Sequence, residues 1–278
     1  MQKQSSRSKN GKRCSIFALY VILFFLLTAC NATPLPSTNR VFIKVAGSTS
    51  MKPLLVQLTK AYSANHPNTS FDIQGGGSQL GRQLVEAGQI GMGMVSGPIS
   101  NPSDNVRLYP IARDSIAVIL NPENSLIELS LHELRGIFSG RILNWQEVDG
   151  LAAAIQVVSR EDGSGTRAVF EASVMDDHPV TPAAVVLPSS QAVADFVAQN
   201  PNAIGYVSTA FVDGRVYPIV VDGVTPTPEN LKSGDYPLTR DLMLMTPVQN
   251  TPEINQFLEF VLSPAGQEIV AQHWGTIR

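Results

Sequence analysis

The sequence is poor in cysteine and histidine. Only Cys14 and Cys30 occur among 278 residues, both near the N-terminus, so disulfides and cysteine-based zinc sites are excluded from the rest of the chain. The four histidines are scattered, and none pairs with another at the i, i+4 spacing of a helical metal site. There is no P-loop, so we do not expect the chain to hydrolyse ATP. We predict no metal, no cofactor and no thiol chemistry.

Charged residues are also few. They make up 15% of the chain against 44% hydrophobic residues, with 21 glycines and 19 prolines, which is typical of a globular protein with many turns. Positions 1–13 hold five basic residues and no acidic one. The remaining chain has 15 Lys and Arg against 23 Asp and Glu, a formal charge of −8. Because nucleic-acid-binding proteins present a clustered basic face, we predict no nucleic-acid partner.

A continuous apolar run over 14–28 follows the basic start, in the order of a signal peptide. The run is shorter than the roughly 20 residues that a spanning helix usually needs. It ends at Leu27-Thr28-Ala29-Cys30, which resembles the lipobox of bacterial lipoproteins. We predict a signal peptide at 1–29, acyl chains such as palmitate on Cys30, and a tether at 30–39. The alternative is an uncleaved membrane helix, and both interpretations place the body outside the cytoplasm.

From Val41 onward, short apolar runs alternate with amphipathic stretches. We expect strands near 41–46, 70–74, 91–96, 116–120, 155–159, 204–208 and 216–221, and helices near 51–65, 79–88, 131–140, 167–175, 192–200 and 252–273, the last broken at Ser263-Pro264. This alternation predicts an α/β fold with mainly parallel sheets.

Three of the expected strand-to-helix junctions share the same small-residue chemistry. They are GSTS at 47–50, GGGS at 75–78 and DGSGT at 162–166. Glycines let a chain approach a ligand closely, free backbone N–H groups remain at helix starts, and Ser and Thr hydroxyls donate further hydrogen bonds. Any one junction is most simply a helix cap. Three together predict a site for an oxyanion.

Arg160 stands at the end of an expected strand, four residues before Ser164. A guanidinium gives bidentate, charged hydrogen bonds to an oxyanion. We expect Arg160 to contact the anion and Asp162 to orient it.

Six segments together resemble one known family, the phosphate-binding proteins of Pst-type ABC importers. They are AGSTSMKPLLVQLTKAY, QGGGSQLG, IGMGMVSGPIS, SREDGSGTRAVFE, FSGRILNW at 138–145 and YPLTRDLMLMT at 236–246. The resemblance covers nearly all of 41–278. It implies a type II periplasmic-binding-protein fold, with two α/β lobes joined by crossing strands and phosphate held between them. The lobes would comprise 40–115 plus 223–278, and 116–222.

The resemblance also implies site residues and partners. The phosphate contacts would be Ser48, Thr49, Ser50, Ser78, Ser96, Arg160, Ser164, Gly165 and Thr166. The partners would be inorganic phosphate, the permease and ATPase subunits of an ABC importer, and the membrane through the lipid anchor. We expect the body to be a monomer.

One segment departs from the family pattern. Some members carry an Asp in the third loop, which accepts a proton from hydrogenphosphate, and others an arginine nearby; here the loop reads Val95-Ser96-Gly97-Pro98. Two alternatives therefore stay open: a receptor for sulfate, molybdate or tungstate, and an anion-sensing or adhesion module of the same fold. An enzyme is not expected, because the G-x-S-x-G spacing is absent and no His stands out as a base.

Overall fold

The computed structural model describes residues 40–99 and 101–277. The predicted signal peptide at 1–29, Cys30 and the tether at 30–39 lie outside the described residues. Residues Arg40–Arg278 group as one compact unit. Within the described ranges, no helix combines the length and apolar character needed to cross a membrane.

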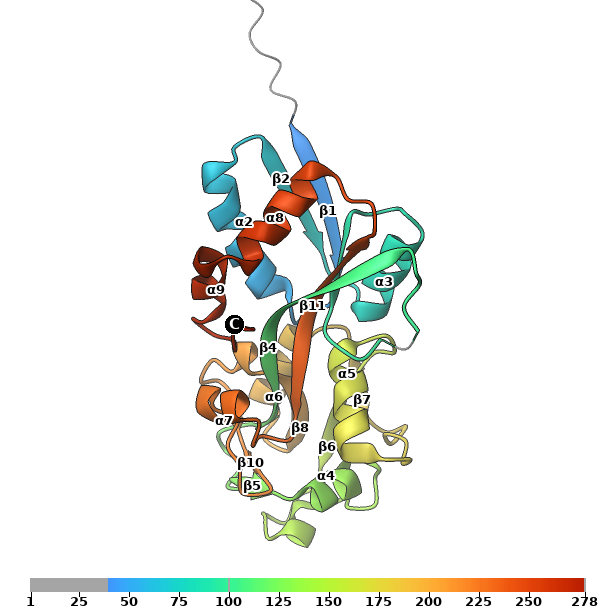
Figure 1. Cartoon of the computed structure of the whole chain (residues 1–278). Coiled ribbons are helices and arrows are strands. Elements are labelled where there is room, and N and C mark those ends of the chain that lie inside the picture. Colours follow the sequence, from blue (N-terminus) through green and yellow to red (C-terminus); the bar gives the residue numbers. More distant parts are fainter. Residues whose placement is uncertain (1–39, 100, 278) are drawn as a thin grey trace, which may run out of the picture. The chain divides into compact units, whose positions relative to one another are not determined.

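The unit is a mixed α/β structure (Figure 1). Its strands are β1 (Val41–Gly47), β2 (Thr69–Gln74), β3 (Met92–Val95), β4 (Val106–Leu120), β5 (Glu128–Leu129), β6 (Gln156–Arg160), β7 (Val185–Leu187), β8 (Ala203–Ser208), β9 (Tyr217–Pro218), β10 (Val220–Val221) and β11 (Thr239–Pro247). Its helices are α2 (Lys52–Asn65), α3 (Ser78–Glu86), α4 (Leu131–Phe138), α5 (Gly165–Phe170), α6 (Ser190–Gln199), α7 (Pro228–Ser233), α8 (Pro252–Leu262) and α9 (Pro264–Val270). Two short 3-10 helices, η1 (Trp145–Val148) and η3 (Thr209–Phe211), and a π-helix, η2 (Glu171–Met175), complete the set.

One sheet runs through the unit in the order β2-β1-β3-β11-β4-β8-β6-β7. The outer pairs are parallel, as the alternating pattern predicted, whereas β4 and β11 are antiparallel to each other. The first part of β4 pairs with β11, and its last part, from Ile116 onward, pairs with β8. This long strand therefore joins the two halves of the sheet.

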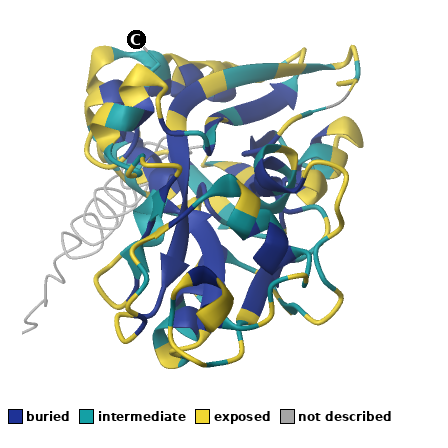
Figure 2. Cartoon of the chain, turned by 90° about the horizontal axis from the view of Figure 1, so that it is seen from below, coloured by how far each residue is buried: buried dark blue, intermediate teal, exposed yellow. Residues whose placement is uncertain are grey.

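Apolar side chains form separate clusters in the two halves, and the strands between them are largely buried (Figure 2). The first cluster gathers side chains of β1, α2, β3, β11 and α8. The second gathers those of β4 beyond Ser115, α4, α5 and β8. We call these halves the first and the second lobe, a proposed division that follows the clusters. Tyr236 and Leu238 pack into the second cluster, so this division assigns 223–238 to the second lobe. The chain then returns to the first lobe from Thr239 onward.

Helices cover the sheet in each lobe. In the first lobe α2, α8 and α9 pack together, while α3 packs on β1 and β3 (Figure 1). In the second lobe α6 packs on β8 and β6, and α5 packs on the same two strands. Ser263 ends α8 and caps α9, its Oγ accepting from the Gly266 N–H, so the predicted break is confirmed.

Candidate anion-binding site

The first predicted loop presents its hydroxyls inward. Gly47 ends β1 with φ 136°, and a Cβ there would lie 2.9 Å from the nitrogen of Met94, so only glycine fits. Ser48 Oγ lies 2.9 Å from Ser50 Oγ, and both side chains are buried. The N-terminus of α2 has no side-chain cap. These hydroxyls are therefore turned toward the interior instead of capping the helix.

The second and third loops bring two further serines to the same place. Ser96 Oγ lies 2.6 Å from Ser48 Oγ and 3.4 Å from Ser78 Oγ. The N–H of Ser96 donates to Ser78 Oγ at 3.1 Å, and Ser78 makes no cap at the start of α3. Four serine hydroxyls from three loops of the first lobe thus form one buried cluster, which we call the serine cluster: Ser48, Ser50, Ser78 and Ser96.

The second lobe closes on this cluster through Gly165 and Thr166. A Cβ on Gly165 would lie 2.7 Å from Ser96 Oγ and still closer to Ser78 Oγ, so the backbone of the second lobe touches the cluster directly. Nearby, the Gln79 N–H donates to the Gly163 carbonyl at 3.1 Å, across the two lobes. Ser164 Oγ accepts from the Arg167 N–H at 3.3 Å and so caps α5.

Arg160 is 1% exposed at the end of β6. Its Nη2 donates to Thr49 Oγ1 of the first lobe at 3.2 Å, and its Nη1 donates to Ser190 Oγ at 3.2 Å. The carboxylate of Glu161 accepts from Nε at 2.9 Å and from Nη2 at 2.8 Å. Arg160 therefore bridges the lobes and is oriented by its sequence neighbour.

The expected role of Asp162 is wrong. Its carboxylate accepts from Arg167 Nη1 at 2.7 Å, and its side chain is 94% exposed. The loop turns at Gly163, where φ is 84°. The side chain of Asp162, just before this turn, points outward, whereas that of Glu161 stays beside Arg160. Spacing in sequence could not distinguish the two acids.

A second buried arginine, which the sequence analysis did not single out, lies at the centre of the site. Arg240 is on β11, and its Nη2 donates to Ser50 Oγ at 3.0 Å. Its Nη1 donates to Thr166 Oγ1 at 2.8 Å and to the Ser96 carbonyl at 3.2 Å. One guanidinium therefore contacts the serine cluster and the second lobe together. The available signal was the arginine within YPLTRDLMLMT, a segment noted only for its family resemblance.

Asp114 holds Arg240 from the neighbouring strand. The two residues are cross-strand partners of β4 and β11, and Asp114 Oδ2 accepts from Nε at 2.9 Å and from Nη2 at 2.6 Å. Asp114 Oδ1 accepts from Ser208 Oγ at 2.8 Å. Both carboxylate oxygens are therefore occupied, and the aspartate is fully buried with its partner.

The charges explain what this arrangement can bind. Burial lowers the pKa of Arg240, the Asp114 carboxylate acts in the opposite direction, and the positive charge of Arg160 lowers this pKa further. Two buried guanidiniums therefore lie next to hydroxyls that can donate, Arg160 beside Thr49 and Arg240 beside Ser50. A tetrahedral anion between them would accept from both sets of donors.

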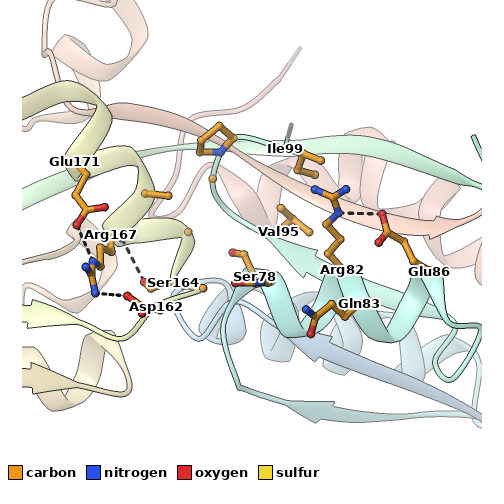
Figure 3. Close-up of a pocket in the computed structure, with 16 residues that line it drawn as sticks. Ser78, Arg82, Gln83, Glu86, Val95, Ile99, Asp162, Ser164, Arg167 and Glu171 are labelled. Carbon is orange, nitrogen blue, oxygen red and sulfur yellow. Dashed lines mark hydrogen bonds and ion pairs between the residues drawn. The ribbon is translucent and has the colours of Figure 1, made fainter. Parts of the chain in front are cut away.

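A cavity of about 540 Å³ adjoins the site (Figure 3). Ser78, Ser164 and Gly165, three of the predicted contacts, form part of its wall. Among the residues in the described ranges, no three His, Cys, Asp or Glu side chains gather in a metal-binding arrangement.

Comparison with known proteins agrees with this geometry. Residues 32–265 match the family described as the PBP superfamily domain. The solved structure of a putative phosphate ABC transporter substrate-binding protein with bound phosphate, from Clostridium perfringens, has a TM-score of 0.83 and 34% identity, covering 86% of this chain and 100% of that one. The chain belongs to the PBP superfamily and to its Pst-type branch.

Two further relatives have lower identity to this chain. The phosphate-binding protein PstS of Bacillus subtilis (strain 168) is 29% identical over 84% of this chain and 80% of its own. An ABC-type phosphate transport receptor from Vibrio cholerae has a TM-score of 0.71 and 29% identity, covering 85% of this chain and all of that one. The predicted type II periplasmic-binding-protein fold is confirmed. The family is one of transport binding proteins, so the prediction that the chain is not an enzyme is confirmed as well.

Proposed function

We propose that this Pst-type protein captures inorganic phosphate between its lobes and delivers it to an ABC importer. The observation that carries the proposal is the convergence of two buried arginines, Arg160 and Arg240, with the serine cluster. The relatives described above are named for phosphate binding or for phosphate transport by ABC transporters, which supports the proposed ligand and the proposed transporter. The permease and ATPase subunits would be separate chains, and the body would act as a monomer.

In the proposed complex all nine predicted residues keep a role, and Arg240 is added to them. Hydroxyls of the serine cluster, with Thr49 and Thr166, would donate to the phosphate oxygens. Arg160 and Arg240 would supply the charge, with Glu161 and Asp114 holding them in place. Ser164 would act through its position at the start of α5, and Gly165 through the close approach that its missing side chain allows.

Calorimetric titration of the full chain in detergent, stripped of co-purified anion, tests the ligand. Phosphate is expected to bind tightly, and sulfate, molybdate and tungstate weakly or not at all. Tight binding of another oxyanion with no binding of phosphate would contradict the proposal. Sulfate is the most informative competitor because it has the shape of phosphate and a similar charge, and the carboxylate oxygens of Asp114 and Glu161 already accept from Arg240, Ser208 and Arg160.

We also propose that the protein is extracytoplasmic and is anchored by acyl chains on Cys30. The signal peptide would comprise 1–29, and residues 30–39 would form the tether between the anchor and the folded body. The apolar run and the lipobox-like tetrapeptide support this. Cys30→Ala is expected to release the protein from the membrane fraction while leaving anion affinity unchanged. A variant that stayed membrane-bound would instead support an uncleaved helix.

A further inference from the structure

The two buried arginines differ in how many of their N–H groups already have partners. A guanidinium has five N–H donors and no acceptor. In Arg240, the N–H of Nε and one N–H of Nη2 point to Asp114, and the other N–H of Nη2 points to Ser50. The two N–H groups of Nη1 donate to Thr166 Oγ1 and to the Ser96 carbonyl. All five donors of Arg240 are therefore used within the protein.

Arg160, in contrast, keeps a donor for the anion. Its Nε and Nη2 donate to the Glu161 carboxylate, and Nη2 donates to Thr49 Oγ1 as well. Nη1 donates to Ser190 Oγ at 3.2 Å, and its second N–H has no acceptor among the residues that the structure describes. Arg160 can thus contact an anion directly, whereas a direct contact from Arg240 would cost a hydrogen bond within the protein.

Each arginine donates to a threonine of the opposite lobe. Arg240, on β11, reaches Thr166 at the start of α5. Arg160, at the end of β6, reaches Thr49 in the loop that follows β1. Under the proposed division of the lobes, both hydrogen bonds run from one lobe to the other. They therefore form only when the lobes are closed.

These two hydrogen bonds fix the direction of the threonine hydroxyls. A hydroxyl has one proton and two lone pairs, and a guanidinium can only donate. Each threonine oxygen must therefore accept from its arginine, so the proton of the hydroxyl points away from that arginine. Among the described residues, each of the two hydroxyls has its arginine as its one hydrogen-bond partner. Both threonine protons are thus left to donate to a bound anion.

Both threonines border the serine cluster. Thr49 directly precedes Ser50. Thr166 follows Gly165, where a Cβ would lie 2.7 Å from Ser96 Oγ, and its side chain is fully buried. A buried hydroxyl whose proton lacks an acceptor loses the free energy of a hydrogen bond. An anion oxygen beside the cluster would supply that acceptor.

We propose that Arg240 is a positioning residue, which acts on phosphate through Ser50 and Thr166 and not by direct contact. When the lobes close, each arginine reaches the threonine of the opposite lobe and turns its proton toward the anion. Arg160 adds a direct, charged contact through Nη1. The phosphate oxygens that face the two threonines are unprotonated, because both hydroxyls donate there. The proposal rests on the proposed phosphate function.

A crystal structure of the protein with bound phosphate tests this assignment. Phosphate oxygens are expected within about 3.0 Å of Thr49 Oγ1 and Thr166 Oγ1, and one within about 3.2 Å of Arg160 Nη1. No phosphate oxygen is expected within about 3.2 Å of a nitrogen of Arg240. A phosphate oxygen inside that distance from Arg240, or threonine hydroxyls that do not contact the phosphate, would overturn the proposal.

Calorimetric titration of variants separates this role from a merely structural one. Thr166→Val removes the hydroxyl and is expected to weaken phosphate binding about tenfold or more, and Thr166→Ser, which keeps the hydroxyl, should recover most of that loss. Arg240→Lys should weaken phosphate binding by a factor at least about threefold smaller in the Thr166→Val background than in the unmodified chain, because one of its two hydroxyl partners is then missing. Losses that simply multiply in the double variant would contradict the proposal.

Thr225→Val is the matched control, because Thr225 is exposed on the segment before α7, and it should leave phosphate affinity unchanged. Circular dichroism checks the fold of each variant. If Arg240→Lys does not fold, the phosphate complex and the two Thr166 variants still decide the question. If the unmodified chain does not bind phosphate, the proposed function itself fails, whereas a phosphate complex with a direct Arg240 contact refutes only the positioning role.

Discussion

Arg240 and Asp114 form a fully buried ion pair between the two strands that join the lobes. Nη2 of the arginine lies 2.6 Å from Oδ2 of the aspartate, and the same guanidinium contacts Ser50 in the first lobe and Thr166 in the second. A buried ion pair alone is weak evidence for stability, because desolvation of both charges offsets their attraction. Its position indicates that Asp114 holds the positively charged guanidinium of Arg240 where the lobes and the serine cluster meet.

Removing the negative charge of Asp114 should therefore destabilise the folded protein. Asp114→Asn leaves Arg240 buried without a counter-charge and is expected to lower the free energy of unfolding by about 3–5 kcal/mol without anion. Phosphate should recover part of this loss, because an anion that binds only the folded state stabilises it. Denaturant titration with and without phosphate measures both effects.

Asp241→Asn is the matched control for this substitution. Asp241 lies 3.7 Å from Arg113 on the same pair of strands, but both side chains are more than half exposed. Exposed pairs contribute about 0–1 kcal/mol, so the control should change stability little. Equal effects of the two substitutions would show that the buried pair has no special role.

Arg160→Ala should weaken phosphate binding without unfolding the protein. Truncating a desolvated charge that pairs with a ligand costs about 2–5 kcal/mol of binding free energy. Calorimetry gives this loss, and circular dichroism checks the fold. Arg215→Ala is the control, since Arg215 pairs with Asp195 and Asp213 at the surface and its side chain is about half exposed. Unchanged affinity in Arg160→Ala would remove this residue from the site.

Local sequence patterns predicted one part of the fold and of the site and missed another. The apolar runs predicted the strands that are buried on both faces, such as the part of β4 from Ile116 to Leu120. They missed the first part of β4, where Pro110, Arg113 and Asp114 interrupt the apolar pattern, and they missed β11, which begins with the polar and charged residues of 239–241. Arg240 was missed with its strand, although it contacts Ser50, Ser96 and Thr166.

The serine-rich junctions illustrate a second limit. Ser and Thr at a helix start predict a cap, and the sequence alone cannot say whether the hydroxyl bonds to the helix or to something else. Ser164 caps α5, whereas neither α2 nor α3 has a side-chain cap, and Ser50 and Ser78 point into the serine cluster. This difference depends on contacts between loops far apart in the chain, which local patterns do not specify.

Alkaline pH should destabilise the protein through its buried tyrosines. Burial raises the pKa of Tyr206 to about 12, while Ser159 and the Arg160 N–H oppose this shift. The unfolded chain loses this proton near pH 10, so the stabilisation is complete below about pH 10 and is lost as the pH rises toward 12, by about 1.4 kcal/mol per pH unit. Burial also raises the pKa of Tyr236, which adds to the same trend.

Denaturant titration between pH 7 and pH 12 measures this slope. Tyr206→Phe should make it shallower above pH 10, and its effect on stability should be constant between pH 7 and pH 9, where both states keep the proton. That constant effect is the loss of the hydrogen bond between Tyr206 and Ser159. A slope above pH 10 unchanged by the substitution would mean that Tyr206 titrates in the folded protein much as it does in the unfolded chain.

Adding one methyl group at Gly165 should prevent the lobes from meeting while each lobe still folds. The backbone at Gly165 is not in the left-handed region, and alanine favours a helix more than glycine does, so the second lobe should tolerate Gly165→Ala. The added Cβ would, however, lie 2.7 Å from Ser96 Oγ and closer to Ser78 Oγ in the arrangement seen here. Phosphate affinity is therefore expected to fall about tenfold or more, and small-angle scattering should no longer show compaction on adding phosphate. Gly91→Ala, whose Cβ would meet only the side chain of Ile254, is the control and should keep both properties. Full affinity in Gly165→Ala would mean that phosphate is held without contact between Gly165 and the serine cluster.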